Sequence, residues 1–356
     1  MIVIADDITG AAEIAGIAFS KGQEVRLLCN SSVYCDTIAV NGTTVIATDT
    51  RSMSEAEAIA ETRRITSAFS LQPSAFFKKT DSALRGHVVA ELTTLMEATG
   101  YQRVVYLPAN PSKGRIIKNG VYYINNVPIH ETDFSFDPEF PAKISVLRER
   151  FPDTERKGII MPDAESEEDI RNIIAQYNDG KTLFAGAADL FSAFLAPFLP
   201  PQVTPLSSHL SPLTSKNTLI LCGSTQSKPL DLGIPNVPMP RDIYDGNDDI
   251  SLWDTNAYNE LHSLILTMPF THRTGKEAAI HLRTMMARKA KELVAQHCPK
   301  HLIIEGGATA WATLQALDWK QFRIERQIAP GVVQMSATNG TLVTLKPGSY
   351  PWGNLF

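Results

Sequence analysis

The sequence predicts an α/β protein of two domains, each a mostly parallel sheet flanked by helices. Three observations predict this class. Short apolar segments alternate with helical ones from the first residue, the alternation resumes after a Pro- and Ser-rich run, and 356 residues suffice for about two domains. The Pro- and Ser-rich run, Ala196–Thr214, is the expected linker. We therefore place the domains at residues 1–205 and 206–356.

The first domain follows a βαβα order, which is typical of parallel strands joined by helices. Apolar and β-branched runs predict strands at Ile2–Ala5, Glu24–Cys29, Thr37–Val40, Val45–Thr48, Ala75–Lys78, Arg103–Leu107, Gly158–Met161 and Thr182–Ala185. The spacing and composition of other segments predict helices at Ala11–Ser20, Glu55–Phe69, Val88–Thr99, Glu165–Tyr177 and Ala188–Leu195. Between Pro108 and Pro141 the helical period is absent, and Asn-rich turns flank a predicted hairpin at Val121–Ile124.

The second domain repeats the α/β pattern in a shorter form. It has expected strands at Asn217–Cys222 and Leu302–Ile304 and expected helices at Thr274–His297 and Thr309–Leu317. The acidic and polar segment Arg241–Asp254 is expected to be a loop.

Composition narrows the function class. The net charge of −5 argues against bulk nucleic-acid binding, and no run reaches the roughly 18 apolar residues of a membrane span. The four cysteines (Cys29, Cys35, Cys222 and Cys298) lack zinc-site spacing and are typical of reduced thiols. The first residues read directly as a strand, so no signal peptide is expected. Together these features predict a cytoplasmic protein with neither nucleic acid nor membrane as partner.

The segment Phe77–His87 is the most informative stretch, because six charged or hydroxyl-bearing side chains surround its single glycine at a strand-to-helix turn. A helix N-terminus and an arginine fork favour an anionic ligand there. The alternative interpretation is a capped helix start with solvated lysines.

Polar residues also follow other strands of the first domain. Asp6 and Asp7 end the first strand, where a carboxylate could act as a general base or help bind a cation; capping of the next helix is the alternative. Arg51 and the turn Pro108–Arg115 follow two further strands. Because ligands of parallel sheets lie beyond the carboxyl ends of the strands, we expect these features to converge.

Glycine turns follow strands in the second domain, at Leu221–Ser227, Glu305–Ala310 and Lys346–Ser349. Glycines allow close approach of the backbone to a phosphate, although a tight turn explains each of them equally well. Neither the P-loop pattern nor GxGxxG occurs, which argues against a dinucleotide-dependent oxidoreductase.

Taken in order, these motifs resemble those of the four-carbon acid sugar kinase family. The resemblance rests on Ala5–Ala11, Lys78–Gly86, Pro108–Arg115, Asn119–Pro128 and Asp163–Asp169, and more weakly on Gly306–Ala310, Pro330–Val332 and Lys346–Gly348. It implies an N-terminal sugar-acid domain, a C-terminal ATP domain and a reaction at their interface. It also implies phosphorylation of a hydroxyl of threonate, erythronate or a 3-oxo-tetronate, with ATP and Mg²⁺ as cofactors. A homo-oligomer is an open expectation.

The resemblance also assigns residues. It implies catalytic roles for Asp7, Asp81 and Lys79, and substrate contacts from Asp6, Arg51, Ser82, Arg85 and Arg115. It implies nucleotide contacts from Ser224, Gly306, Gly307, Ala308, Thr309 and Gly348; metal ligands are not assigned. Arg51 or Arg85 could bind the carboxylate of the sugar acid. Asp7 is our expected base, with Asp81 as its rival.

The chain departs from the family pattern at several positions. Ala83 stands where the family usually has threonine, Ala308 where it has an acidic residue, and Ser224–Ser227 differs from the usual serine-rich turn. Ala308 and the Ser224–Ser227 turn motivate an alternative hypothesis, a catalytically weakened relative that binds a sugar acid as a sensor or partner.

Overall fold

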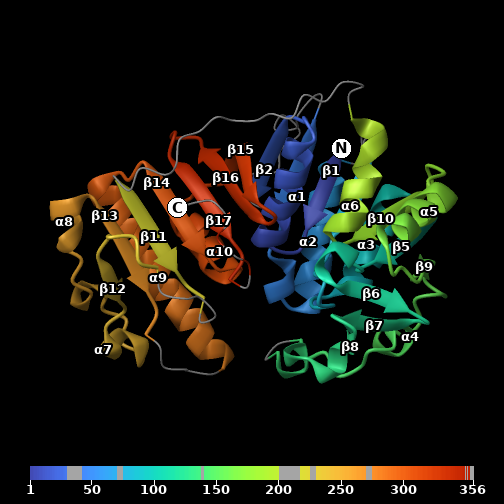
Figure 1. Ribbon diagram of the computed structural model, residues 1–356, viewed down its shortest axis with the longest axis horizontal. Coiled ribbons are helices and arrows are strands. Elements are labelled where there is room, and N and C mark those ends of the chain that lie inside the picture. Colours follow the sequence, from blue (N-terminus) through green and yellow to red (C-terminus); the bar gives the residue numbers. More distant parts are fainter. Residues whose placement is uncertain are drawn as a thin grey trace. The chain divides into compact units, whose positions relative to one another are not determined.

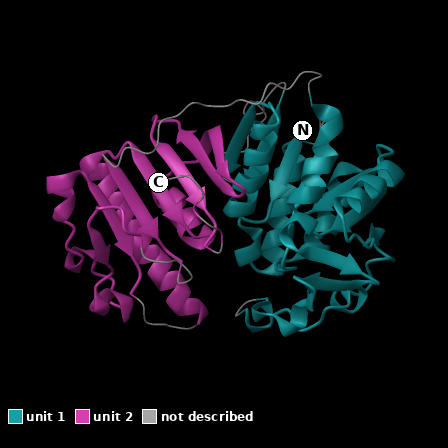
Figure 2. Cartoon of the chain, in the orientation of Figure 1, with its two compact units in different colours: residues 1–205 teal, residues 206–356 magenta. Residues whose placement is uncertain are grey.

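The chain divides into two compact units, residues 1–205 (unit 1) and 206–356 (unit 2), which Figure 2 colours separately. The computed structural model describes residues 1–29, 42–69, 75–137, 140–199, 217–224, 230–269, 275–348, 350 and 352. Each unit combines a β-sheet with helices, as the sequence predicts (Figure 1). Among the described helices, none is both long and apolar enough to cross a membrane.

The sheet of unit 1 is parallel in every strand pair, in the order β2-β3-β1-β4-β10-β5-β9. Its strands are β1 (Ile2–Ala5), β2 (Val25–Cys29), β3 (Thr43–Ala47), β4 (Phe76–Lys79), β5 (Arg103–Leu107), β9 (Ile159–Ile160) and β10 (Thr182–Gly186). All residues of β1, β3, β4 and β10 are buried, as expected for parallel strands covered on both faces. The loops that follow these strands therefore lie along one edge of the sheet.

Helices cover both faces of this sheet. Crossovers between parallel strands are right-handed, so a crossover toward one edge of the sheet places its helix on one face, and a crossover toward the other edge places its helix on the opposite face. In Figure 1, α1 (Ile8–Ser20), α5 (Glu167–Tyr177) and α6 (Ala188–Leu195) pack together on one face, and α2 (Glu55–Ser67) packs with α3 (Val88–Thr99) on the other. Helix α1 begins three residues before its predicted start, because the Asp7 side chain accepts a hydrogen bond from the Gly10 N–H and caps it.

A small antiparallel sheet extends from unit 1 and confirms the predicted hairpin. It consists of β6 (Arg115–Lys118), β7 (Val121–Ile124) and β8 (Val127–Pro128). Asn119 and Gly120 both have positive φ (52° and 73°), the backbone that a two-residue hairpin turn requires. The Tyr122 hydroxyl donates to the carbonyls of Ser82 (2.5 Å) and Pro108 (3.2 Å), so β7 is fastened to the loops after β4 and β5. Unit 1 also contains α4 (Leu147–Arg150) and short 3₁₀ turns at Thr50–Ser52, Pro111–Lys113, Ile129–Glu131, Asp133–Phe136 and Ala196–Phe198.

The sheet of unit 2 has the order β12-β13-β11-β14-β17-β16-β15. Its strands are β11 (Thr218–Cys222), β12 (Asn236–Pro238), β13 (Ser263–Thr267), β14 (His301–Glu305), β15 (Gln321–Ala329), β16 (Val332–Ala337) and β17 (Leu342–Lys346). The pairs from β12 to β17 are parallel, whereas β15, β16 and β17 form an antiparallel meander. The helices are α7 (Arg241–Tyr244), α8 (Ala257–Leu261), α9 (Lys276–His297) and α10 (Gly307–Ala316).

Two expectations for unit 2 need correction. The segment Arg241–Asp254 is not all loop: it contains α7 and a 3₁₀ turn at Ile250–Leu252, because Ile243 and Tyr244 are buried and anchor a helical turn. Helix α10 begins two residues before its predicted start. The expected strand Thr37–Val40 and most of the expected linker lie outside the described residues.

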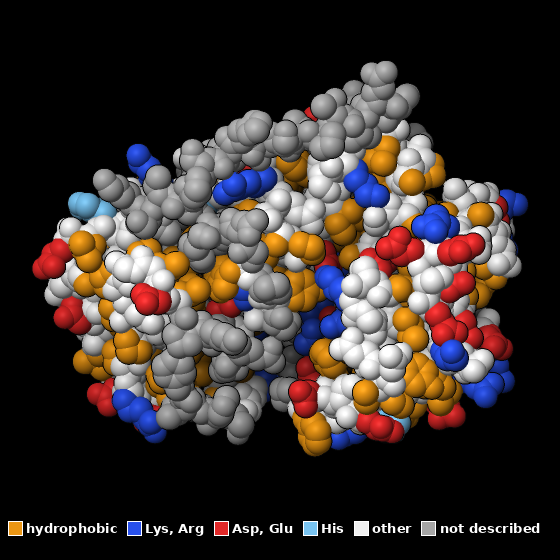
Figure 3. All heavy atoms as spheres, viewed as in Figure 1, with side chains coloured by type: hydrophobic (Ala, Val, Ile, Leu, Met, Phe, Trp, Pro, Cys, Tyr) orange, Lys and Arg blue, Asp and Glu red, His pale blue; other side chains and the backbone are white. Residues whose placement is uncertain are grey.

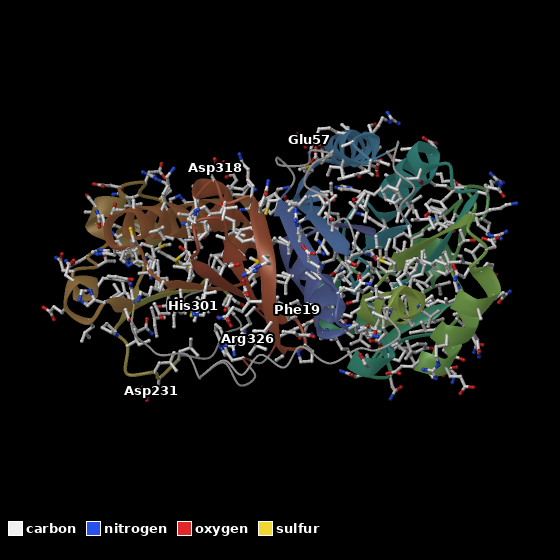
Figure 4. All side chains as sticks on the ribbon, turned by 90° about the horizontal axis from the view of Figure 1, so that it is seen from above. Phe19, Glu57, Asp231, His301, Asp318 and Arg326 are labelled. Carbon is white, nitrogen blue, oxygen red and sulfur yellow. The ribbon has the colours of Figure 1, made fainter. Side chains whose placement is uncertain are left out.

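A buried polar chain crosses the sheet of unit 2. His301 Nε2 lies 2.8 Å from Thr344 Oγ1 and 3.4 Å from Gln334 Nε2, and Arg326 Nε donates to Gln334 Oε1 at 3.0 Å. Figure 4 labels His301 and Arg326 within this part of the sheet. Burial, with a smaller contribution from Arg326, lowers the pKa of His301 from 6.5 to about 4.

We expect acid to destabilise unit 2 through His301. Between pH 6.5 and about 4 the unfolded chain binds a proton at this residue and the folded chain does not, so stability is lost as the pH falls through this window. The loss is about 3 kcal/mol at most. It can be measured by urea unfolding followed by tryptophan fluorescence, because all four tryptophans lie in unit 2.

His301→Gln should flatten this dependence on pH, whatever its effect on stability at pH 7. Equal slopes for His301→Gln and the unmodified protein would contradict the assignment.

Candidate functional site

Charged side chains gather where the strands of unit 1 end. Those predicted from the sequence lie at or after the ends of four strands. Asp6 and Asp7 follow β1, and Arg51 follows β3. Lys79 ends β4 and is followed by Asp81, Ser82 and Arg85, and Arg115 begins β6 directly after the turn that follows β5. Direct contacts join them in three groups. Arg51 and Arg85 contact the carboxylates of Asp6, Asp7, Asp81 and Asp137, Lys79 and Lys113 contact Glu13, and Arg115 contacts Ser82. We call the three groups the cluster because Lys79, Asp81 and Ser82 lie within four consecutive residues at the end of β4 and in the loop after it. Figure 3 shows acidic and basic side chains close together on the surface of this unit.

Arg51 is the centre of this cluster. Its Nε and Nη2 donate to Asp6 Oδ2 at 3.0 and 2.9 Å, and Nη2 lies 3.2 Å from Asp7 Oδ1 and 3.7 Å from Asp81 Oδ1. Burial opposes the charged form of Arg51, but the three carboxylates outweigh it and raise the pKa of Arg51 well above its usual value. One guanidinium thus joins the loops after β1, β3 and β4.

Asp81 organises the loop in which it lies. Its carboxylate accepts two bonds from the Arg85 fork, at 2.7 and 3.0 Å, and two from the backbone N–H groups of Ala83 (3.0 Å) and Arg85 (3.3 Å). Burial raises the pKa of Asp81, but Arg85 and Arg51 outweigh it and hold the pKa well below its usual value. The loop includes Leu84 at φ 63° and Gly86 at φ 91°, a strained path that these bonds hold in place.

Asp7 is anionic as well but has fewer fixed partners. Its Oδ1 accepts the Gly10 N–H at 2.9 Å and its Oδ2 accepts the Thr9 hydroxyl at 2.5 Å. Burial raises the pKa of Asp7, yet Arg51 and Lys79, with the Thr9 bond, bring the pKa below its usual value. The Lys79 ammonium donates to the Thr80 carbonyl at 3.0 Å.

Asp6 differs from its neighbour. Its side chain is 3% exposed against 15% for Asp7, and its buried Oδ1 has no hydrogen-bond partner among the residues that the structure describes. Burial raises the pKa of Asp6, and Arg51 opposes this effect. Asp6 is therefore the buried carboxylate that accepts two hydrogen bonds from Arg51, whereas Asp7 is more accessible to solvent.

Sequence reasoning missed several partners of the cluster. Glu13 of α1 pairs with Lys113 and lies 3.6 Å from Lys79 Nζ, and Asp137 Oδ2 lies 3.5 Å from Arg85 Nη1. The signal for Glu13 was present, because an acid within an Ala- and Ile-rich helix needs a cation when it is buried. The sequence gives no comparable signal for Asp137, because it lies 52 residues from Arg85 and only folding brings the two together.

A second buried pair lies beneath the cluster. Lys78 Nζ donates to Glu91 Oε2 at 2.6 Å, and the Thr50 hydroxyl donates to the same oxygen at 2.8 Å. Because Thr50 precedes Arg51, this pair links α3 and β4 to the turn that carries the central guanidinium.

In unit 2, glycine turns follow the adjacent strands β11, β14 and β17. The Gly306 N–H donates to the Lys346 carbonyl at 2.9 Å, and the Gly223 N–H donates to the Glu305 carbonyl at 3.1 Å. The turns are so close that a Cβ at Gly348 would overlap Ser224 Oγ, and one at Gly223 would overlap Thr309 Oγ1. The structure therefore brings together the predicted nucleotide residues Ser224, Gly306, Gly307, Ala308, Thr309 and Gly348; the rest of the Ser224–Ser227 turn lies outside the described residues.

The N-terminus of α10 lies at the centre of these turns. Gly306, at φ 97°, is its N-cap residue, and no side chain caps the helix. The first N–H groups of a helix have no partner within the helix and attract anions such as phosphate.

A buried ion pair supports the glycine turns. Lys346 donates to Glu305 Oε1, and the two side chains are 2% and 1% exposed. The same ammonium lies 3.1 Å from the Pro347 carbonyl and 3.3 Å from the Gly348 carbonyl. The pair thus fixes the turn after β17 relative to the turn after β14.

The described residues contain no group of three or more His, Cys, Asp or Glu side chains that could hold a metal ion. Mg²⁺ commonly binds through one or two carboxylates together with substrate phosphates, so these residues are compatible with a Mg²⁺ ion that arrives with a nucleotide.

Two family models match the chain in this order. The model described as "Sugar-binding N-terminal domain" matches residues 1–154, and that described as "Nucleotide-binding C-terminal domain" matches residues 249–350. The first covers the charged cluster of unit 1, and the second covers the glycine turns after β14 and β17.

Named relatives agree with these matches. A D-threonate kinase of Salmonella typhimurium is 30% identical over 54% of this chain and 52% of its own, so the chain spans about half the length of this relative. A 3-oxo-tetronate kinase of Brucella melitensis is 27% identical over 98% of this chain and 92% of its own. The solved structure of Haemophilus influenzae protein HI1011, at 21% identity, has a TM-score of 0.67 and covers 100% of this chain and 98% of its own, which indicates a shared fold.

We expect Glu305→Gln to destabilise unit 2 by about 3–5 kcal/mol, because it leaves the Lys346 charge buried without a carboxylate. Tryptophan fluorescence during urea unfolding measures the change. Asp245→Asn, which removes one partner of an exposed pair with Arg241 in the same unit, is the control, and its urea unfolding curve should hardly change. The double variant Glu305→Met/Lys346→Met should recover part of the lost free energy of unfolding, because it removes both charges. A double variant at least as unstable as Glu305→Gln would contradict this explanation.

Proposed function

Because the chain belongs to the four-carbon acid sugar kinase family, we propose that it transfers the γ-phosphoryl group of ATP to a hydroxyl of a four-carbon sugar acid. The relatives named as D-threonate, D-erythronate and 3-oxo-tetronate kinases supply the substrate candidates. In this proposal unit 1 binds the acid and unit 2 binds the nucleotide. A cytoplasmic location and self-association belong to the proposal as well.

The observation that carries the proposal is the presence of two chemically different strand-end sites in one chain. Unit 1 offers paired carboxylates and cations, which suit the hydroxyls and carboxylate of a sugar acid. Unit 2 offers glycine turns and an uncapped helix N-terminus, which suit phosphate groups. Mg²⁺ would supply charge compensation at the phosphates.

We assign the base to Asp7. In the reaction, the substrate hydroxyl oxygen forms a bond to the γ-phosphorus while the bond to ADP breaks, and Asp7 takes the hydroxyl proton. The rival Asp81 already accepts four hydrogen bonds from its own loop, whereas Asp7 is more exposed and accepts two. Lys79, which lowers the pKa of Asp7, would compensate negative charge in the transition state. Asp6, Ser82 and Arg85 would position these groups and the substrate.

The alternative function, a sugar-acid sensor without turnover, is favoured by one observation. Ala308 is exposed at the start of α10, where the family usually has an acidic side chain. Calorimetric titration with ATP and Mg²⁺ separates the two functions, since a pure sensor has no need to bind nucleotide.

The direct test is ATP consumption by the purified protein with D-threonate, D-erythronate and 3-oxo-tetronate. Turnover with at least one acid is expected. No turnover with any of them by a folded protein that binds the acids would favour the sensor.

Asp7→Asn should lower kcat by about 10²- to 10⁴-fold, as expected for loss of a general base. Asparagine is as good an N-cap residue as aspartate, so α1 should remain intact and the thermal midpoint should change little. Asp153→Asn removes the same charge at a side chain that is 61% exposed and is the control. If Asp81→Asn lowered kcat more than Asp7→Asn without loss of stability, Asp81 would be the base.

Gly306→Ala should weaken binding of ATP and Mg²⁺ by about tenfold, because a side chain is strained at φ 97° and relief would move the start of α10. Gly340→Ala is a matched control: Gly340 also has positive φ (86°), has open space around it, and lies in the turn before β17. Both variants should lose similar stability, and calorimetry should show weaker binding of ATP and Mg²⁺ for Gly306→Ala alone. If both variants bound ATP with equal affinity, the nucleotide would not bind at the start of α10.

A further inference from the structure

A sugar-acid kinase needs a cation for the substrate carboxylate, and two candidates in unit 1 already have acidic partners. Arg51 gives two bonds to Asp6, and Arg85 gives two bonds to Asp81. If a substrate carboxylate replaced either partner, a buried aspartate would lose its counter-charge at a considerable cost in free energy.

Arg115 is different. The ion pairs among the described residues of unit 1 include Arg51, Lys79, Arg85 and Lys113 of the cluster, but not Arg115. Its Nη1 donates to the Ser82 hydroxyl, and the guanidinium lies 5.5 Å from the centroid of the Phe134 ring. A guanidinium has further N–H donors in a planar fork, so this one retains capacity for a carboxylate.

The surroundings hold Arg115 in a fixed position. It begins β6 and exchanges two backbone hydrogen bonds with Asn110 (2.7 and 3.2 Å), which closes the turn after β5. The Tyr122 hydroxyl fixes the carbonyl of Ser82, whose side chain contacts Arg115. A half-buried guanidinium that is held by a ring and a hydroxyl loses little entropy when it binds an anion.

Arg115 also contacts the loop that supplies a neighbour of the proposed base. Its partner Ser82 follows Asp81 in sequence, and Asp81 and Asp7 both lie within 4 Å of Arg51 Nη2, at 3.7 and 3.2 Å. The loop after β4 thus carries both the hydroxyl that contacts Arg115 and a carboxylate that shares Arg51 with Asp7.

We propose that Arg115 binds the carboxylate of the substrate and thereby makes the enzyme select four-carbon acids over the corresponding uncharged polyols. This inference rests on the proposed kinase function. It assigns Arg51 and Arg85 to holding the aspartates rather than to binding the carboxylate.

The test compares the sugar acid with its polyol, in which CH₂OH replaces the carboxylate. For the acid that the unmodified protein uses best, Arg115→Gln should raise KM by about 100-fold and change kcat by less than about threefold, because the lost bonds are made equally in the ground and transition states. The low kcat/KM for threitol or erythritol should stay unchanged, so discrimination between acid and polyol should collapse. Arg115→Lys keeps the charge but not the planar fork, so its KM for the acid should lie between those of Arg115→Gln and the unmodified protein.

Arg156→Gln is the matched control, because Arg156 is 88% exposed in the same unit and should leave both substrates unaffected. Thermal unfolding verifies that each variant is folded; should Arg115→Gln fail to fold, Arg115→Lys gives the same comparison. Discrimination between acid and polyol that survives in the folded Arg115 variants would overturn the inference. If the unmodified protein has no turnover with any acid, the proposed function fails instead, and acid binding by the Arg115 variants, measured by calorimetry, still tests the carboxylate contact.

Discussion

The constraint on which unit 1 depends is the cost of burying carboxylates beside one another. Asp6, Asp7 and Asp81 come from two loops and meet at the edge of the sheet, where each would repel the others if it were ionised and unpaired. The Arg51 guanidinium removes that cost because it lies within 4 Å of all three. The buried Lys78–Glu91 pair beneath it supports the turn that carries Arg51. Consequently the positions of the proposed base and of the Asp81 loop depend on a residue that is itself neither base nor nucleophile.

Unit 2 meets a similar constraint in a different way. Among the residues of unit 2 that the structure describes, the pair Glu305 and Lys346 is buried almost completely, and glycine turns adjoin it. The Lys346 ammonium also donates hydrogen bonds to the carbonyls of Pro347 and Gly348, so its charge helps to fix the backbone of the turn after β17. What remains available to a ligand are the N–H groups at the start of α10. Backbone donors suit a polyanion that carries its own metal ion, whereas the mixed charges of unit 1 suit a small, polar and singly charged acid.

How much the sequence could predict depended on whether the signal was local. The strands β1 and β5 were identified at their observed bounds, because buried parallel strands are largely apolar runs. β4 (sequence FFKK) was placed one residue too early, and only its two phenylalanines gave an apolar signal. The meander β15–β17 was missed: in β15, charged Arg323, Glu325 and Arg326 accompany buried Phe322 and Ile324, so no apolar run marks the strand. The charged residues that the structure places at the strand ends had been named from motif order, but their partners had not. Which aspartate Arg51 or Arg85 binds is decided by contacts between loops that are far apart in sequence.

Those partners change what the same residue types can do. From the sequence, Arg51 and Arg85 are the expected candidates for the substrate carboxylate, and Arg115 is expected only to contact the substrate. In the folded chain, two of them neutralise aspartates and the third, Arg115, contacts a hydroxyl and an aromatic ring. A cation that compensates a buried acid cannot bind a substrate anion without leaving that acid uncompensated, so its charge is not free for recognition. The substrate carboxylate is therefore bound by Arg115, which has no acidic partner among the described residues. Arg115 lies on the β6–β7 hairpin, which the Tyr122 hydroxyl attaches to the loop after β4 through the Ser82 carbonyl.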